Sequence, residues 1–138
     1  MSNSKLKDLG SLRYFLGLEV ARSTSGINLN QHKYTIDLLS ETGYLNSKPA
    51  SSPMLPNSKL SKTSGSLLFD ITAYRQLIGK LLYLTHTRLD ISFAVQQLSQ
   101  FFDYPTDVHL QAAHPILRYL KGSPSQGLFF PTDNALKL

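Results

Sequence analysis

The spacing of apolar residues changes at about residue 31, and this change constrains the fold more than any other feature of the chain. Before it, residues 12–20 are apolar and aromatic and end in an alternating pattern, which is typical of a β-strand. Residues 23–26 (Ser-Thr-Ser-Gly) have the composition of a turn, and residues 27–30 alternate again. We therefore expect an N-terminal β-hairpin.

After residue 31 the apolar side chains fall at helical spacing, and Gly43 is well placed to end that helix. A stretch rich in Ser, Pro and Lys follows over residues 47–66, with no aromatic and no acidic residue, as in a linker or surface loop. The expected organisation is a hairpin and helix over 1–46, a linker over 47–69 and helices over 70–138.

The second half contains three helix-start signals. Asp70, Asp90 and Thr106 are N-cap residue types, and each precedes an apolar helical pattern. The first helix should run to about His86. The second should bury the inner positions Ile91, Ala94, Val95, Leu98, Phe101 and Phe102. The third should end at residues 121–122, before a short strand at 127–130. The expected fold class is α+β: a β-hairpin with a helix, then a mainly helical bundle and a short C-terminal strand.

Composition narrows the function classes. Fourteen Lys and Arg against nine Asp and Glu give a net charge of +5, a moderate bias towards phosphate-bearing partners. Zero cysteines exclude disulfides and thiolate chemistry. No apolar stretch approaches the roughly 18 residues of a membrane span. We expect a soluble, intracellular chain without a membrane partner.

Catalytic patterns are missing. The acidic residues are scattered singly, with no two within three positions, so no paired carboxylates for Mg²⁺ stand out. The four histidines lack zinc-ligand spacing, and there is no phosphate-binding glycine loop. We expect no catalytic residue, no metal site and no bound cofactor in this chain.

One row of residues suits contact with a nucleic-acid groove. In a helix over 74–83, Arg75, Gly79 and Tyr83 fall at i, i+4 and i+8, on one face. A cation, a residue without a side chain and an aromatic ring would then face outward together. Purely structural roles are the alternative, since Gly79 could permit close helix–helix packing and Tyr83 could belong to the core.

An ordered set of motifs carries a family resemblance. Two motifs lie near the N-terminus: Lys-Asp-Leu-Gly at 7–10 and Tyr-Phe-Leu-Gly-Leu-Glu-Val at 14–20. Three lie in the second half: Tyr-Arg-Gln-Leu-Ile-Gly-Lys-Leu at 74–81, Thr-His-Thr-Arg at 85–88 and Leu-Arg-Tyr-Leu-Lys-Gly at 117–122. In these motifs the chain resembles the reverse transcriptase region of the Pol polyprotein of copia-type LTR retrotransposons. The resemblance covers nearly the whole chain.

This resemblance implies the end of the palm, a primer-grip hairpin and the thumb and connection of an RNA-directed DNA polymerase. In the family, the Tyr-x-Asp-Asp motif that binds the Mg²⁺ ions lies upstream of Lys-Asp-Leu-Gly. The ribonuclease H domain begins after a Leu-Lys-Leu like that at 136–138. We therefore expect a fragment truncated before ribonuclease H and without either catalytic centre.

By the same resemblance, the expected partner is an RNA–DNA hybrid or duplex. The implied contact residues are Arg75, Gly79, Lys80, Tyr83 and Arg88 around the thumb helix, and Tyr14 and Gly17 in the hairpin. Lys80 and Arg88 would add phosphate attraction that salt screens. For two other residues we expect structural roles: Asp90 would cap a helix, and Glu19 would be a solvent-facing strand residue.

Two alternatives remain open at this stage: a protein-interaction module, or a functionless remnant of a decayed element. In each case an exposed apolar face on the hairpin could associate with the missing palm or with a second copy.

Pro115 lies inside the third predicted helix, where the family usually has a basic residue. It removes the bond to the Gln111 carbonyl and costs roughly 3 kcal/mol, so we expect a kink or a break into two shorter helices.

Overall fold

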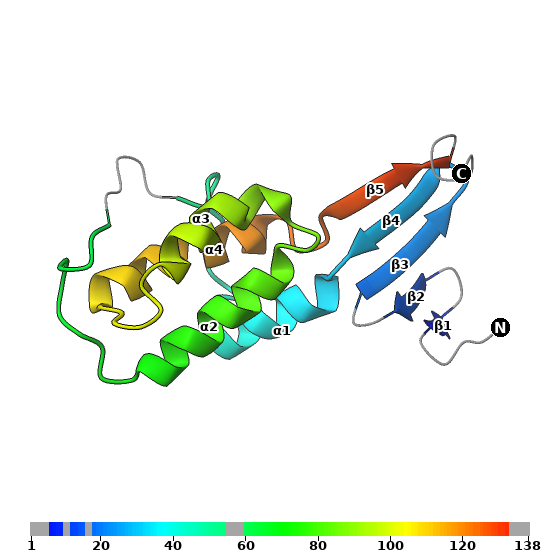
Figure 1. Cartoon of the computed structure of the whole chain (residues 1–138). Coiled ribbons are helices and arrows are strands. Elements are labelled where there is room, and N and C mark those ends of the chain that lie inside the picture. Colours follow the sequence, from blue (N-terminus) through cyan, green and yellow to red (C-terminus); the bar gives the residue numbers. More distant parts are fainter. Residues whose placement is uncertain (1–5, 10–11, 16–17, 55–59, 133–138) are drawn as a thin grey trace.

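The computed structural model describes residues 6–9, 12–15, 18–54 and 60–132, with side chains from residue 18 onward. The molecule is elongated, with a β-sheet at one end and a body of helices at the other (Figure 1). The α+β class and the order of a hairpin, helices and a short C-terminal strand are therefore confirmed.

The sheet is an antiparallel meander to which a distant strand is added. Its strand order is β1-β2-β3-β4-β5. The bounds are β1 Leu6–Leu9, β2 Leu12–Phe15, β3 Leu18–Ser23, β4 Gly26–Asn30 and β5 Gly127–Pro131. The predicted hairpin corresponds to β3 and β4. The prediction of one strand over 12–20 was wrong, because β2 and β3 are separate strands paired with Phe15 opposite Leu18.

Strand β5 closes one edge of the sheet by pairing with β4 almost a hundred residues earlier, with Leu128 opposite Leu29. At the far end of this pair, Gly26 has φ of 153° and lies so close to β5 that a Cβ would stand 2.2 Å from the Phe130 carbonyl oxygen. A side chain at this position would force the two strands apart.

Helix α1 (His32–Thr42) begins directly at the end of β4. The Asn30 Oδ1 atom accepts the backbone N–H of His32 at 2.9 Å, and Glu19 Oε2 accepts that of Lys33 at 2.6 Å. Glu19 is only 6% exposed, so the interpretation as a solvent-facing strand residue was wrong. Instead its carboxylate satisfies one free N–H group of the first helical turn, that of Lys33. At the other end, Gly43 adopts φ of 82°, as predicted for a helix stop.

Three further helices and a 3₁₀ turn complete the body: α2 Ile71–Leu84, η1 Leu89–Ile91, α3 Ser92–Ser99 and α4 Asp107–Gly122. Two predicted caps are confirmed, since Asp70 accepts the N–H of Ala73 and Thr106 accepts that of His109. The third was wrong, because Asp90 lies within η1 and makes no cap bond to α3. Phe102, expected in the core, is 39% exposed.

The helix α4 is continuous through Pro115, so the predicted break into two shorter helices was wrong. Pro115 lies on the buried face with Ala113, Ile116 and Leu117, and their packing holds the helix together across the missing hydrogen bond. The carbonyl of Gln111 that loses its partner belongs to an exposed residue, where water can satisfy it.

The apolar core lies entirely within the helical body among the described residues. Its members are Leu38 and Leu39 of α1, Tyr74, Leu77, Ile78, Leu81 and Leu84 of α2, Ile91 of η1, Ala94, Val95 and Leu98 of α3, and Ala113, Ile116, Leu117 and Leu120 of α4. No sheet residue with a described side chain belongs to this cluster.

Polar side chains form the junction where the sheet meets the helices. The Thr87 hydroxyl donates to Gln31 Oε1 at 2.6 Å, and the Arg88 Nη1 atom donates to the Ser123 carbonyl at 2.7 Å. Ser125 and His32, on either side of the same junction, are joined at 2.7 Å. Gln31, Thr87 and Arg88 are each at most 3% exposed. Among the described side chains, hydrogen bonds therefore fasten the sheet to the body, and the apolar core does not extend across the junction.

Candidate nucleic-acid interface

Helix α2 presents one outward face that carries the predicted row of Arg75, Gly79 and Tyr83. Exposed residues on the same face include Gln76 and His86. The opposite side of α2 supplies five core residues, so the helix cannot rotate to bury this row. Helix α2 has no acidic residue, which leaves its outer face without a carboxylate of its own to repel phosphates.

Gly79 lies open at the middle of this face. A Cβ built on it would meet no described atom within 4 Å. The interpretation that Gly79 permits tight packing between helices therefore finds no support among the described residues. A glycine in a helix interior costs about 1 kcal/mol relative to alanine, and no described neighbour requires that cost here.

The Arg75 side chain lies along the surface towards the loop after α3. Its Nε atom donates to the Phe102 carbonyl at 2.9 Å and its Nη2 atom to the Asp103 carbonyl at 3.2 Å. The guanidinium also stands 5.1 Å from the centre of the Phe102 ring. These contacts use two of its five N–H groups and hold the loop against α2.

Tyr83 and Lys80 both lean towards α1. The Tyr83 ring meets Tyr34 edge to face at 4.8 Å and lies 5.5 Å from His86. The Lys80 Nζ atom lies 2.6 Å from Glu41 Oε2. The hydrogen bond to Glu41 raises the pKa of Lys80, so this side chain stays cationic. Tyr83 is partly buried but does not belong to the apolar core, and its contact with a nucleic acid stays a prediction.

Arg88 was predicted to attract phosphate at the surface, and its position contradicts that expectation. Its side chain is 1% exposed. It binds Asp90 through two nitrogens at 3.0 and 3.2 Å, and it binds both oxygens of Ser123. The ring of Tyr119 covers the guanidinium at 5.7 Å. Arg88 therefore serves the polar junction and not the outer face.

The Asp90 carboxylate, whose side chain is 27% exposed, pairs with the buried Arg88 guanidinium. Burial, the largest single influence, would raise the pKa of Asp90, but hydrogen bonds from Arg88 and Tyr119 and the charge of Arg88 together lower it. The Tyr119 hydroxyl donates to Asp90 Oδ2 at 2.7 Å. The predicted N-cap role was wrong, because the carboxylate accepts hydrogen bonds from Arg88 and Tyr119 and none from the first turn of α3.

One of the two contact residues predicted in the hairpin lies in a described strand. Tyr14 belongs to β2, where it pairs in register with Glu19, but its side chain lies outside the described part. Gly17 lies outside the described residues altogether.

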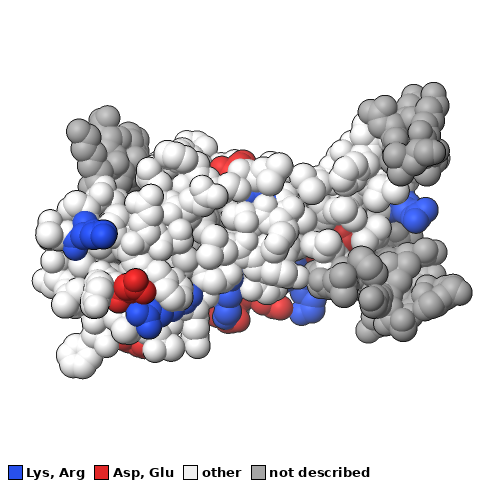
Figure 2. Space-filling model, viewed as in Figure 1, with Lys and Arg blue, Asp and Glu red and all other residues white. Residues whose placement is uncertain are grey.

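Charged side chains are dispersed over the face shown in Figure 2, where Lys and Arg often neighbour Asp or Glu. No basic strip runs through Arg75, Lys80 and Arg88, since Lys80 is paired and Arg88 is buried. Within the described part of the chain, no three His, Asp or Glu side chains gather as a metal site requires. No described helix has the length and apolarity to cross a membrane.

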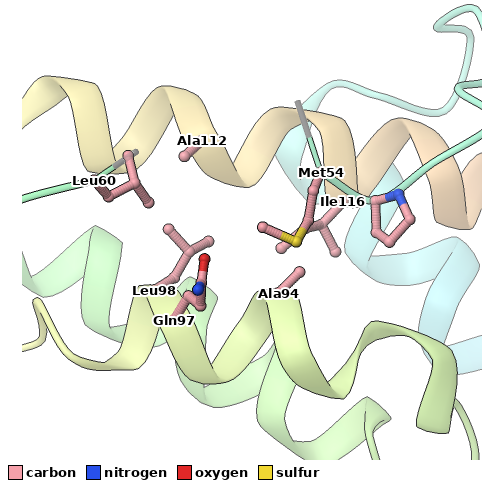
Figure 3. A pocket seen from close by; sticks show the side chains of 8 residues that line it. Met54, Leu60, Ala94, Gln97, Leu98, Ala112 and Ile116 are labelled. Atoms are coloured by element: carbon pink, nitrogen blue, oxygen red, sulfur yellow. The ribbon is translucent and has the colours of Figure 1, made fainter. Parts of the chain in front are cut away.

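A small cavity lies between α3 and α4, beneath the segment that joins α1 to α2 (Figure 3). It holds about 10 Å³, and its walls are mostly apolar, formed by Pro53, Met54, Leu60, Ala94, Gln97, Leu98, Ala112 and Ile116. This volume suits at most one water, so the cavity reflects how the joining segment packs and offers no ligand site.

Comparison with known proteins places the chain in a family. It is 49% identical over 133 residues to the retrovirus-related Pol polyprotein from transposon RE1 of Arabidopsis thaliana, and 45% identical to that from transposon RE2. Each match covers 96% of this chain and 9% of the relative. An uncharacterized mitochondrial protein of the same plant is 37% identical over 99% of this chain and 57% of its own length.

No family model and no solved structure matches the chain. The curated transposon relatives nevertheless agree along almost its whole length, and the chain spans about a tenth of theirs. The chain belongs to the retrovirus-related Pol polyproteins of copia-type transposons and corresponds to one segment of them.

Proposed function

We propose that this chain is the thumb-like segment of a retrotransposon reverse transcriptase and that the outer face of α2 contacts a primer–template RNA–DNA hybrid. The observation that carries the proposal is Gly79, an exposed glycine in a helix interior with open space above it. Such a position gives a duplex access to the helix backbone, as groove contact requires.

The neighbours of Gly79 support the same role. Arg75 keeps donor groups beyond the two that bind the loop carbonyls, and these groups can reach a groove edge or phosphate. The Tyr83 ring offers an apolar edge to a sugar. Lys80 supplies a cation at the border of the face, at the cost of its pairing with Glu41. The proposed contact is therefore largely independent of base sequence.

The experiment measures binding, because the described residues hold no cluster of metal ligands for polymerisation. A labelled RNA–DNA hybrid is titrated with the chain and followed by fluorescence anisotropy, from about 50 to 200 mM salt. We expect Gly79→Gln to weaken binding about tenfold, or about 1.4 kcal/mol. The new side chain blocks the approach, yet its Cβ meets no described atom within 4 Å and glutamine favours the helix.

A matched pair of charge variants controls for general electrostatics. Gln76→Glu places a carboxylate on the proposed face, and Gln111→Glu places one at an exposed position of α4. Both lower the net charge by one, but only Gln76→Glu should weaken binding several-fold. Circular dichroism confirms that all variants are folded. If Gly79→Gln binds as well as the parent chain, the α2 face is not the interface.

A further inference from the structure

A hollow of about 340 Å³ lies at the end of the helical body, where two loops meet. Lys62 approaches it from the segment before α2, and Gln100, Phe101, Asp103 and Tyr104 approach it from the loop between α3 and α4. This volume falls within the range of small-molecule sites, unlike the cavity beneath the joining segment. Neither the family nor the α2 face accounts for it.

His109 holds the floor of this hollow in place. Its ring stacks on Phe101 with the centroids 3.8 Å apart and the planes 13° from parallel. The His109 Nδ1 atom accepts the backbone N–H of Thr106, so in the neutral ring Nε2 carries the hydrogen and donates to the Ser61 carbonyl at 2.8 Å. One buried side chain thus connects the segment bearing Lys62 to the floor formed by Phe101.

Further contacts fix the two loops relative to the helices. The backbone N–H of Leu68 donates to the Pro105 carbonyl at 3.0 Å, and the backbone N–H of Asp107 donates to the Ser66 carbonyl at 2.9 Å. On the other side, Arg75 binds the carbonyls of Phe102 and Asp103. Arg75 is therefore a positioning residue for the wall that carries Asp103, and the hollow is preformed.

The lining groups have a distinct chemistry. Phe101 forms an apolar floor but is only 6% exposed, so Tyr104, which is 75% exposed, offers the larger free ring. Asp103 is a carboxylate that accepts hydrogen bonds. Gln100 both donates and accepts, and Lys62 is a cation. A ligand that matches all of these has a flat ring, N–H groups along one edge and an anionic substituent.

We propose that this hollow binds one unpaired nucleotide, with its base on the exposed ring of Tyr104 over the Phe101 floor, its edge N–H groups on Asp103 and its phosphate near Lys62. Guanine fits best, because its N1–H and N2–H groups lie side by side and can both donate to one carboxylate. Aromatic stacking combined with hydrogen bonds to the pairing edge is the usual way in which proteins read unstacked bases. The site is distinct from the α2 face.

The experiment measures the affinities of guanosine, inosine and uridine 5′-monophosphates by NMR titration of the whole chain. Guanosine monophosphate should bind about fivefold or more tightly than uridine monophosphate, the lower range for a bidentate base contact. Inosine monophosphate, which lacks the 2-amino group, should fall between them. Asp103→Asn should remove the preference for guanosine over inosine monophosphate, whereas Asp37→Asn, the matched change on α1, should preserve it.

Two further variants separate the phosphate from the base. Lys62→Gln should weaken the binding of guanosine monophosphate and leave the binding of free guanosine unchanged. Tyr104→Ala should weaken the binding of both. Lys62, Asp103 and Tyr104 are exposed, so these variants should remain folded. Equal affinity for the three nucleotides, or equal effects of Asp103→Asn and Asp37→Asn, would overturn the proposal. Mononucleotides form no duplex, so this outcome is independent of the test of the α2 face.

Discussion

Lys80 and Glu41 join α2 to α1 through an ion pair of 2.6 Å, although 39 residues separate them in the chain. Both side chains are substantially exposed, at 40% and 53%. The cation that borders the proposed interface is therefore already engaged by an acid of the neighbouring helix. A phosphate that binds Lys80 has to compete with Glu41.

We expect Glu41→Gln to strengthen hybrid binding about two- to fivefold, because an exposed pair holds its lysine only weakly. The salt dependence should steepen by about 0.9 in log–log slope if one more phosphate contact forms. Asp37→Asn changes the net charge equally and removes the pairing of Lys33, so it serves as the control. Combining Glu41→Gln with Lys80→Ala should abolish the gain. An equal gain from Asp37→Asn would show a general charge effect instead.

Arg88→Met should destabilise the fold by about 2–3 kcal/mol, measured by urea unfolding. The change leaves Asp90 and the Ser123 carbonyl without their buried donor. Arg22→Met, at an exposed position of β3, should change stability by less than about 0.5 kcal/mol. If Arg88→Met weakens hybrid binding while leaving stability intact, then Arg88 has a surface role after all.

Acid should destabilise the chain in part through His114. Burial and the nearby charge of Arg118 lower the pKa of His114 below its ordinary value of 6.5. The folded state therefore binds this proton less readily than the unfolded state, and the stability is present above pH 6.5 and is lost as the pH falls below it. Urea unfolding from pH 8 downward should show a decline that His114→Gln reduces and that the exposed His86→Gln preserves. Identical profiles for His114→Gln and the parent chain would contradict this.

High pH should destabilise the fold in part through Tyr74, whose hydroxyl donates a hydrogen bond to the Leu98 carbonyl at 2.7 Å. Burial raises the pKa of Tyr74 from 10.0 to about 12. Its contribution is thus present below pH 10 and is lost as the pH rises towards 12.

Tyr74→Phe should cost about 1 kcal/mol at neutral pH, since the Leu98 carbonyl keeps a bond from Phe101. This cost should shrink in alkali, as measured by unfolding at pH 7 and pH 11. A cost that stays constant between these two pH values would contradict the assigned role.

Sequence signals that span only a few neighbouring residues predicted the ends of several helices correctly. Asp70 and Thr106 cap their helices and Gly43 ends α1, because each motif is complete within a few residues. Asp90 has the same residue type in the same local pattern. Its carboxylate instead accepts hydrogen bonds from Arg88 and Tyr119. Tyr119 lies 29 positions away, so a capping rule that considers only neighbouring residues cannot foresee this contact.

Pairings between distant segments could not be predicted in the same way. The chain alternates in β4 and again near residue 128, but nothing local indicates that these strands lie side by side. The row on α2 was predicted from helical geometry alone, whereas the partners of Arg75 and Lys80 lie 27 or more positions away. Sequence therefore located the candidate face, and the structure determines which of its cations are engaged.

The polar junction at Gln31, Thr87 and Arg88 has a consequence for how the molecule opens. With the apolar core confined to the helices, backbone amides of α2 and α4 should exchange with solvent only through global unfolding. Amides of β3 and β4 depend on hydrogen bonds at the junction, so they should exchange through smaller openings that leave the helices closed. The boundary between the two cooperative units should fall at Gln31 on one connection and Ser123 on the other.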